Sequence, residues 1–267
     1  MIGRCFVAAL ALGTVVAGGA TAASIGDTPF AAVYEMSAAP DPTGDLTSMG
    51  GVQSIEWSPD CEGGTLVQQL VLRAEINAGP TVDTSIRFSA WESLDASRFR
   101  FFFSLSDSLG KEEKIEGLAV REDGKITVEY KTPEAETKSL PGDVMFPWQH
   151  LRAIQKAARD GKKSVSFSVL RGEKPEKDPA DVYTQIIGRV AADDDAKAVK
   201  GGADLLAGSY LRIATGVFEQ PIEETPSFET AETLTDNGII INGELKFPDL
   251  HLRMKLREVQ TSPKPEC

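Results

Sequence analysis

Apolar and polar residues alternate with a period of two along most of this chain. In the segment 98–105, Phe99, Phe101 and Phe103 fall on one face, and the segment 250–257 alternates leucine or methionine with basic residues. Such alternation is typical of β-strands that bury one face and expose the other. The pattern therefore predicts a sheet-rich protein in which each strand contributes one face to a core.

About thirteen segments have this strand pattern, and none of the intervals between them has the rhythm of a parallel βαβ fold. Asp123-Gly124 and Asn237-Gly238 are strong signals for tight hairpins. We therefore expect a mainly β protein with one large antiparallel curved sheet, a β-spiral or near-closed barrel. The predicted strands are 31–36, 52–57, 66–76, 86–91, 98–105, 115–120, 126–130, 164–169, 182–190, 210–218, 228–234, 239–247 and 250–259. The charged segment 133–138 and Asp193 to Asp195 are expected to be loops.

The period changes once, over residues 148–160, where an amphipathic helix is expected. Pro147 suits the first helical position, and Gly161 suits the C-terminal cap. A lone helix among antiparallel strands covers an open face of the sheet or plugs the mouth of a curved one. The apolar face of this helix is formed by Trp148, Leu151, Ile154 and Ala158.

Residues 1–23 have the pattern of a secretory signal peptide: Arg4, a short apolar run over 6–17, and small residues before a cleavage site. The alternative is a buried N-terminal helix. Cys5 precedes the apolar run and so cannot be the lipidated cysteine of a lipoprotein leader. No later apolar run approaches the roughly 20 residues of a membrane helix. We expect an exported protein whose residues 24–267 form a single domain without a membrane span.

The net charge is −12, and removal of the leader with Arg4 and no acidic residue makes it −13. Nucleic-acid binding needs clustered lysine and arginine, and so does docking on anionic lipid headgroups. The charge excludes both partner classes and is best explained by solubility.

Export leaves two cysteines, Cys61 and Cys267, in an oxidising compartment where they can pair. Free or intermolecular thiols are the alternative. His150 and His251 are far apart in sequence from each other and from the cysteines, and Asp193 to Asp195 lack the spacing of an EF-hand loop. The sequence therefore predicts a disulfide, no metal site and no cofactor.

Two further interpretations concern chemistry. The face with Phe99, Phe101 and Phe103 is a candidate binding face, although core packing is the commoner cause of such a stripe. A hydrolase would have to pair His150 with a serine such as Ser164 or Ser166, but no Gly-x-Ser-x-Gly elbow is present. We therefore expect a protein that is not an enzyme.

Several motifs together resemble the envelope integrity protein EipB family of Gram-negative periplasmic proteins. They are Tyr34-Glu35-Met36, Gly50-Gly51, Trp57 ahead of Cys61-Glu62-Gly63, Phe146-Pro147-x-x-His150, and the terminal Cys267. The likeness covers the whole chain after the leader. It departs at Gly64, where the family tends to have an aromatic residue.

The resemblance implies a periplasmic β-spiral with one helix, an intramolecular disulfide, and a role in cell-envelope integrity under stress. The fold it implies is similar to the LolA and LolB lipoprotein carriers. The expected function is therefore non-enzymatic binding of a partner protein, a peptide or a lipoprotein acyl chain on the curved sheet, by a monomer. A structural scaffold with a filled interior is the alternative.

Overall fold

The computed structural model describes residues 28–39, 46–77, 79–219, 224–248, 250–264 and 266–267. The signal peptide expected over residues 1–23 lies outside the described residues. The strands are β1 (Phe30–Ala38), β2 (Leu46–Pro59), β3 (Gly63–Ile76), β4 (Thr81–Ser93), β5 (Arg98–Asp107), β6 (Glu112–Glu122), β7 (Lys125–Thr132), β8 (Glu136–Pro141), β9 (Ser164–Val169), β10 (Ala180–Ala191), β11 (Ser209–Phe218), β12 (Phe228–Leu234), β13 (Ile240–Phe247) and β14 (Leu250–Thr261). The helices are α1 (Pro147–Arg159) and α2 (Asp194–Lys197), with a 3₁₀ turn at Pro175–Lys177.

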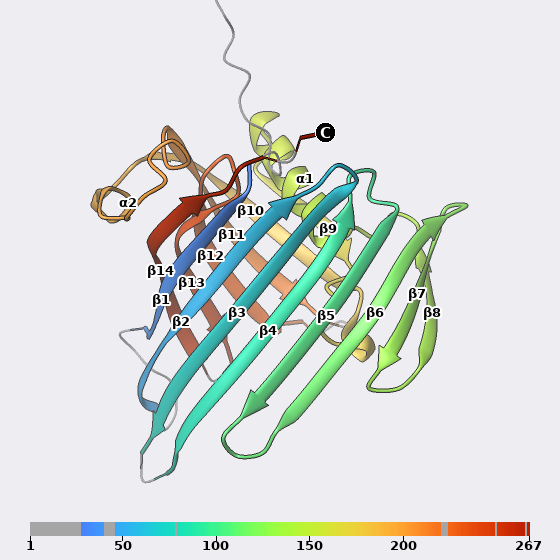
Figure 1. Ribbon diagram of the computed structural model, residues 1–267, viewed down its shortest axis with the longest axis horizontal. Helices are drawn as coiled ribbons and strands as arrows, with labels where there is room; N and C mark the ends of the chain where they lie inside the picture. Colours follow the sequence, from blue (N-terminus) through green and yellow to red (C-terminus); the bar gives the residue numbers. More distant parts are fainter. Residues whose placement is uncertain (1–27, 40–45, 78, 220–223, 249, 265) are drawn as a thin grey trace, which may run out of the picture.

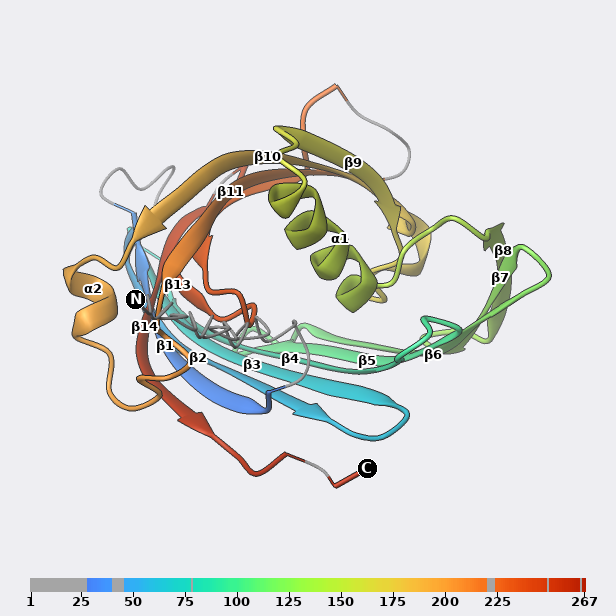
Figure 2. The same cartoon turned by 90° about the horizontal axis from the view of Figure 1, so that it is seen from above.

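All fourteen described strands belong to one antiparallel sheet in the order β8-β7-β6-β5-β4-β3-β2-β1-β14-β13-β12-β11-β10-β9. The chain forms one meander from β1 to β8 and a second from β9 to β14, and the last strand pairs with the first. The sheet curls round but does not close, because β8 and β9 remain its two edges (Figures 1 and 2). The predicted curved antiparallel sheet is confirmed.

The strand that the sequence pattern did not predict is β8, which begins within the segment 133–138 that was expected to be a charged loop. It pairs with β7 from Tyr130↔Glu136 to Lys125↔Pro141 and is largely exposed. Charged residues and proline are common on edge strands, where they discourage pairing with other chains. The segment therefore lacks apolar alternation because it is an edge.

Helix α1 lies inside the curve of the sheet, between β9–β11 on one side and β3–β6 on the other (Figure 2). Pro147 occupies its first turn, as expected. Its C-terminus is a Schellman motif, with Gly161 N–H bonded to Ala158 O and Lys162 N–H bonded to Ala157 O. Gly161 has a φ of 73°, the left-handed conformation that this motif requires.

The second helix, α2, replaces the polar turn expected at Asp193 to Asp195. Asp193 is its N-cap, and its carboxylate accepts a hydrogen bond from Ala196 N at 3.0 Å. Ala196 is the buried residue of this short helix and packs in the core cluster around β1 and β14. One aspartate therefore serves as a cap, a role that sequence alone does not separate from a solvated loop.

The core is built from the inward face of each strand. On β1 these residues are Phe30, Ala32, Tyr34 and Met36, all buried, and on β14 they are Leu252, Met254 and Leu256. Among the described residues, the two largest of four apolar clusters are centred on β1 and β14 and on β5 to β7, and a third joins the buried face of α1 to β10, β11 and β12. The period-two prediction therefore identifies the interior face correctly.

Candidate functional site

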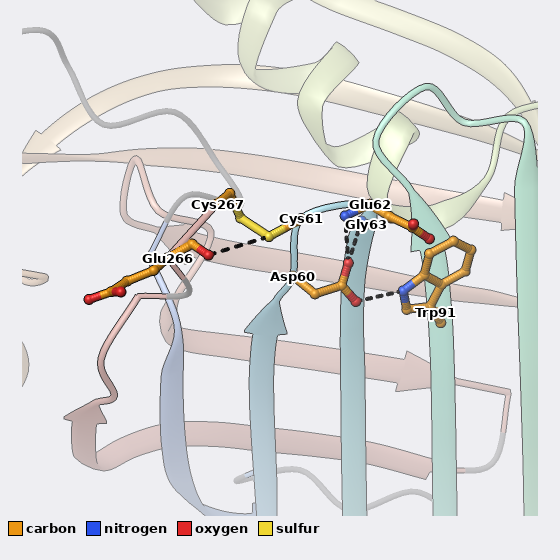
Figure 3. The surroundings of a disulfide bond; sticks show 7 residues. All are labelled: Asp60, Cys61, Glu62, Gly63, Trp91, Glu266 and Cys267. Atoms are coloured by element: carbon orange, nitrogen blue, oxygen red, sulfur yellow. Dashed lines mark hydrogen bonds between the residues drawn. A yellow bond between two sulfur atoms is a disulfide. The ribbon is translucent and has the colours of Figure 1, made fainter.

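The turn between β2 and β3 is joined to the end of the chain. A disulfide links Cys61 and Cys267, whose Cα atoms are 5.5 Å apart and whose sequence separation is 206 (Figure 3). Asp60 holds the turn, since its carboxylate accepts hydrogen bonds from Glu62 N, Gly63 N and Trp91 Nε1. The disulfide thus attaches the C-terminal tail to a turn that is already braced by the sheet.

Gly64, where the sequence departs from the family pattern, has a specific neighbour. A Cβ atom at this position would lie 2.2 Å from the indole ring of Trp57. Trp57 stacks in turn on Trp148 in the first turn of α1, with ring centroids 3.9 Å apart. The missing side chain at Gly64 therefore leaves the space in which Trp57 packs beneath the helix.

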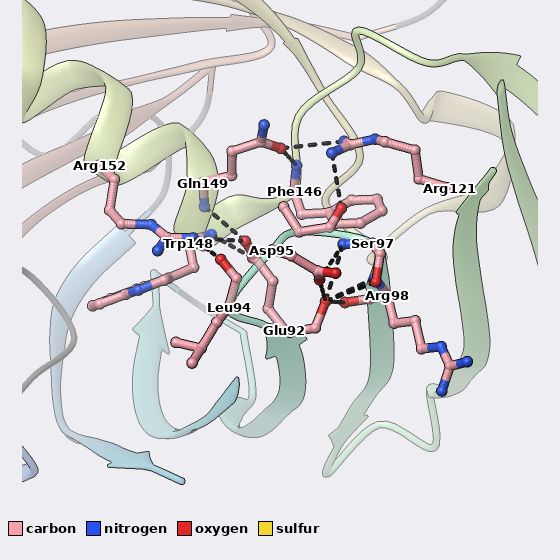
Figure 4. Close-up of polar contacts among 12 residues, drawn as sticks. Glu92, Leu94, Asp95, Ser97, Arg98, Arg121, Phe146, Trp148, Gln149 and Arg152 are labelled. Atoms are coloured by element: carbon pink, nitrogen blue, oxygen red, sulfur yellow. Dashed lines mark hydrogen bonds and ion pairs between the residues drawn. The ribbon is translucent and has the colours of Figure 1, made fainter. Parts of the chain in front are cut away.

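The start of α1 is anchored by a carboxylate from another element. Glu92 on β4 is 5 % exposed and accepts hydrogen bonds from Trp148 N and Gln149 N, both at 2.8 Å (Figure 4). These are backbone groups that have no partner within the helix itself. Burial raises the pKa of Glu92 to about 7, against the opposing effect of these two hydrogen bonds and of nearby Arg152 and Arg121.

Arg121 fixes the segment just before α1. Its guanidinium donates to Ala96 O at 2.8 Å, to Val144 O at 2.6 Å and to Gln149 Oε1 at 3.2 Å. It also lies over the ring of Phe146, 4.6 Å from the centroid. Phe146 is fully buried. Of the family motif residues, Phe146 therefore caps the helix start within the core, and Pro147 begins the helix beside an apolar cavity.

An apolar cavity of about 150 Å³ lies between the start of α1 and the inner face of the sheet. Trp57 and Glu92 are among its lining residues, so the stacked indoles and the helix anchor border the same space. The cavity is also lined by apolar side chains from the sheet and from α1, namely Ile55, Leu66, Phe88, Phe99, Trp148 and Leu151.

The candidate binding face is divided by the structure. Phe99 and Phe101 are both 1 % exposed and stack with ring centroids 5.2 Å apart, but only Phe99 borders the cavity. Gly172 covers Phe101 so closely that a Cβ atom there would lie 2.6 Å from the ring. Phe103 is half-buried and packs against the same aromatic cluster. Of this stripe, the structure therefore places Phe99 at the cavity and Phe101 in the core.

The groups of the hydrolase alternative are not brought together. The ring of His150 packs edge-on against Phe167 with centroids 5.7 Å apart, and burial lowers the pKa of His150 to about 4. Ser164 and Ser166 are exposed on the opposite face of β9, because they alternate with Phe167. Within the described residues, the Nε2 atom of His150 has no hydrogen-bond partner. This arrangement holds no nucleophile and base pair.

The part of the chain that the structure describes lacks two further features. No group of three or more His, Cys, Asp or Glu side chains there is close enough to hold a metal ion. None of the helices in the described ranges is long and apolar enough to cross a membrane.

Sequence reasoning missed Glu92, Arg121 and the Trp57–Trp148 stack. The first and last of these depend on contacts between β2 or β4 and a helix more than 50 residues later. The signal that could have pointed to Glu92 is its position as an acidic residue at the end of an apolar strand run.

Known proteins are similar to this chain in sequence and in fold. Residues 21–263 match the family model described as EipB-like. The chain is 25 % identical over 244 residues to the cell envelope integrity protein EipB of Brucella abortus (strain 2308), covering 90 % of this chain and 86 % of that protein. Its fold is similar to the crystal structure of a beta-barrel-like protein, of a domain of unknown function, from Brucella abortus. That structure has a TM-score of 0.82 at 20 % identity and covers 91 % of this chain and 100 % of its own. With a family match over nearly all of its length and the fold in common, the chain belongs to the EipB-like family.

Proposed function

We propose that this protein is a non-enzymatic periplasmic protein that supports envelope integrity by accepting one apolar group of an envelope partner in the cavity beside α1. The family name supports the envelope role, because the Brucella relative is named for cell envelope integrity. The signal-peptide pattern and the cysteine pair support the periplasm. The observation that carries the binding role is the apolar cavity itself.

The size of the cavity limits what it can accept. Sites for drug-sized molecules are roughly 300–1,000 Å³, whereas an apolar cavity of about 150 Å³ holds a group the size of benzene. The cavity beside α1 is about 150 Å³. It suits one aromatic or branched aliphatic side chain of a partner polypeptide, or the end of a single acyl chain. A complete diacyl lipid exceeds it.

The surroundings of the cavity support a preformed site. Glu92 and Arg121 fix the start of α1 by hydrogen bonds, and Trp57 stacks on Trp148 at the cavity wall. A rigid wall lowers the entropy lost on binding, which favours affinity for a small apolar group. The packing of His150 against Phe167, away from the exposed Ser164 and Ser166, supports a binding role over catalysis.

A filled scaffold is the second candidate, and the stacking of Phe101 on Phe99 and of Phe99 on Phe146 favours it. These rings fill the interior next to the cavity. The two candidates differ in whether the remaining space takes up a ligand.

Titration with dansyl-labelled undecanoic acid, followed by dansyl emission, separates the two. Leu151→Trp adds volume at the cavity wall, and Leu109→Trp makes the same change at a side chain that is 63 % exposed. The wild type and Leu109→Trp are expected to bind the probe saturably, and Leu151→Trp is expected to bind it at least tenfold more weakly with an unchanged circular dichroism spectrum. If the wild type shows no saturable binding, or if Leu151→Trp binds the probe equally well, the binding role is rejected and the filled scaffold is favoured.

A further inference from the structure

The outer face of the sheet, opposite the side that carries the cavity, has a second hollow. A groove of about 500 Å³ extends over β11 to β14 and is bordered by α2 through Asp195. Its volume lies within the roughly 300–1,000 Å³ of small-molecule sites. The family resemblance and the proposed function do not use this surface.

The strand register places four polar side chains in one row across this groove. Arg212 on β11 is opposite Thr233 on β12, which is opposite Asn242 on β13, which is opposite Lys255 on β14. Neighbouring strands lie about 4.8 Å apart, so the row spans about 14 Å. The row faces outward, because the residues that alternate with it, such as Leu211 beside Arg212, are buried in the interior.

A second row runs parallel to the first, two residues along each strand. Glu244 on β13 is opposite Arg253 on β14, and Arg253 is opposite Ser37 on β1. The guanidinium of Arg253 donates to Glu244 at 3.2 Å. The charges of Glu244 and Arg253 therefore cancel within this second row.

Most charged side chains of the groove are paired, but one is not. Lys255 forms an ion pair with Asp195, and Arg257 forms one with Glu35. The guanidinium of Arg212 has no hydrogen bond or ion pair within the described part of the chain. Glu232 also borders the groove but alternates with Thr233 and so points to the interior face.

The balance of charge in the groove differs from that of the whole molecule. The outward-facing lining has four cations, Arg212, Arg253, Lys255 and Arg257, against three carboxylates, Glu35, Asp195 and Glu244, which gives 4 − 3 = +1. The whole chain has a net charge of −12. In so acidic a protein, a groove with a surplus cation has a local preference for anions.

We infer that this groove binds a small polyhydroxylated anion, such as a sugar phosphate or sugar acid. The planar guanidinium of Arg212 can bind a phosphate or carboxylate through two parallel hydrogen bonds. The Thr233 hydroxyl and the Asn242 amide can both donate and accept, which suits the hydroxyl groups of a sugar. The row supplies these groups in one line across three neighbouring strands.

Isothermal titration calorimetry of the full mature chain tests the inference, with glucose 1-phosphate and glucuronate as probes. Inorganic phosphate and glucose each supply one half of the proposed chemistry. At least one of the two anionic sugars is expected to bind with a Kd below about 1 mM. Arg212→Gln is expected to weaken this binding by about tenfold or more, because charge-assisted hydrogen bonds are lost. Asn242→Ala is expected to weaken it by a smaller factor.

The control is Arg100→Gln, which removes an exposed arginine of β5 outside the groove and should leave binding unchanged. Four results would overturn the inference: no saturable heat with either anionic sugar, equal affinity for inorganic phosphate, equal affinity for neutral glucose, or an equal loss in Arg100→Gln and Arg212→Gln. None of these results depends on the cavity beside α1, so the two sites are tested separately.

Discussion

The indole rings of Trp57 and Trp148 stack with their centroids 3.9 Å apart and an angle of 13° between the ring planes. Trp57 ends the inner face of β2, and Trp148 is in the first turn of α1. The stack is therefore the direct apolar contact between the helix start and the sheet, next to the polar contact made by Glu92. The two contacts together fix one wall of the apolar cavity.

A double-mutant cycle measures the stack. We expect Trp57→Ala and Trp148→Ala to be coupled by about 0.5–1.5 kcal/mol, the range found for aromatic pairs beyond their buried area. The free energies of unfolding of the two single variants and the double variant, from urea titrations, give the coupling. Strictly additive losses would show that the two rings stabilise the protein independently.

The buried face of α1 makes a second prediction. Ile154 is 3 % exposed, so Ile154→Ala should cost about 2–5 kcal/mol. Leu151 also lies on the predicted apolar face but is only half-buried, so Leu151→Ala should cost less. Lys156→Ala, at an exposed position, should cost under about 0.5 kcal/mol. Thermal melts of the three variants check this order, and equal small shifts would mean that the helix is not docked.

Glu92 makes a prediction about pH. Burial raises its pKa in the folded protein from 4.5 to about 7. Between these two pH values the folded state holds the proton and the unfolded state does not. The resulting stabilisation is fully present below pH 4.5 and is lost as the pH rises through about 7. A shift of this size corresponds to about 3 kcal/mol at most.

Glu92→Gln removes this titration while keeping one acceptor for the helix start. The free energy of unfolding of the wild type minus that of Glu92→Gln should therefore fall between pH 4.5 and pH 7. Urea titrations at several pH values measure it, and Glu112→Gln, at an exposed position on β6, is the control for loss of one carboxylate. A difference that does not change with pH, or that rises, would contradict a raised pKa for Glu92.

Features of the fold that are determined by residues close together in sequence could be predicted, whereas features that depend on residues far apart in sequence could not. The strands and α1 are set by local alternation, by Pro147 and by Gly161, and the predicted bounds agree within three residues, except that β2 and β4 begin six and five residues earlier than expected. Edge strand β8 was missed, because Glu136 and Lys138 have no buried face to reveal it. The row from Arg212 to Lys255 depends on the register of four strands, which alternation alone does not determine.

The same distinction holds for the site. Cys61 and Cys267 were identified because they are the two cysteines after residues 1–23, the expected leader. Glu92 was not, because the groups it binds, Trp148 N and Gln149 N, are 56 and 57 residues away in sequence. Phe101 was included in a possible binding face because an apolar stripe does not show whether a residue such as Gly172 covers it.

The last prediction concerns the disulfide between Cys61 and Cys267, which closes a loop of 206 residues. A loop of this length lowers the entropy of the unfolded chain, and the chain-entropy estimate is about 5 kcal/mol as an upper figure. Cys61→Ser and Cys267→Ser should lower the melting temperature by similar amounts. The double variant should be no less stable than either single one, because all three changes remove the same bond.

Thiol labelling of unfolded, unreduced protein purified from the periplasm measures the bond directly, and two labelled cysteines per mature chain would refute it. A dimer on a non-reducing gel would show instead that the bond joins two chains. If the bond is present but the three variants have the melting temperature of the wild type, the disulfide contributes nothing to the stability of the sheet. The hydrogen bonds to Asp60 would then hold the turn without it.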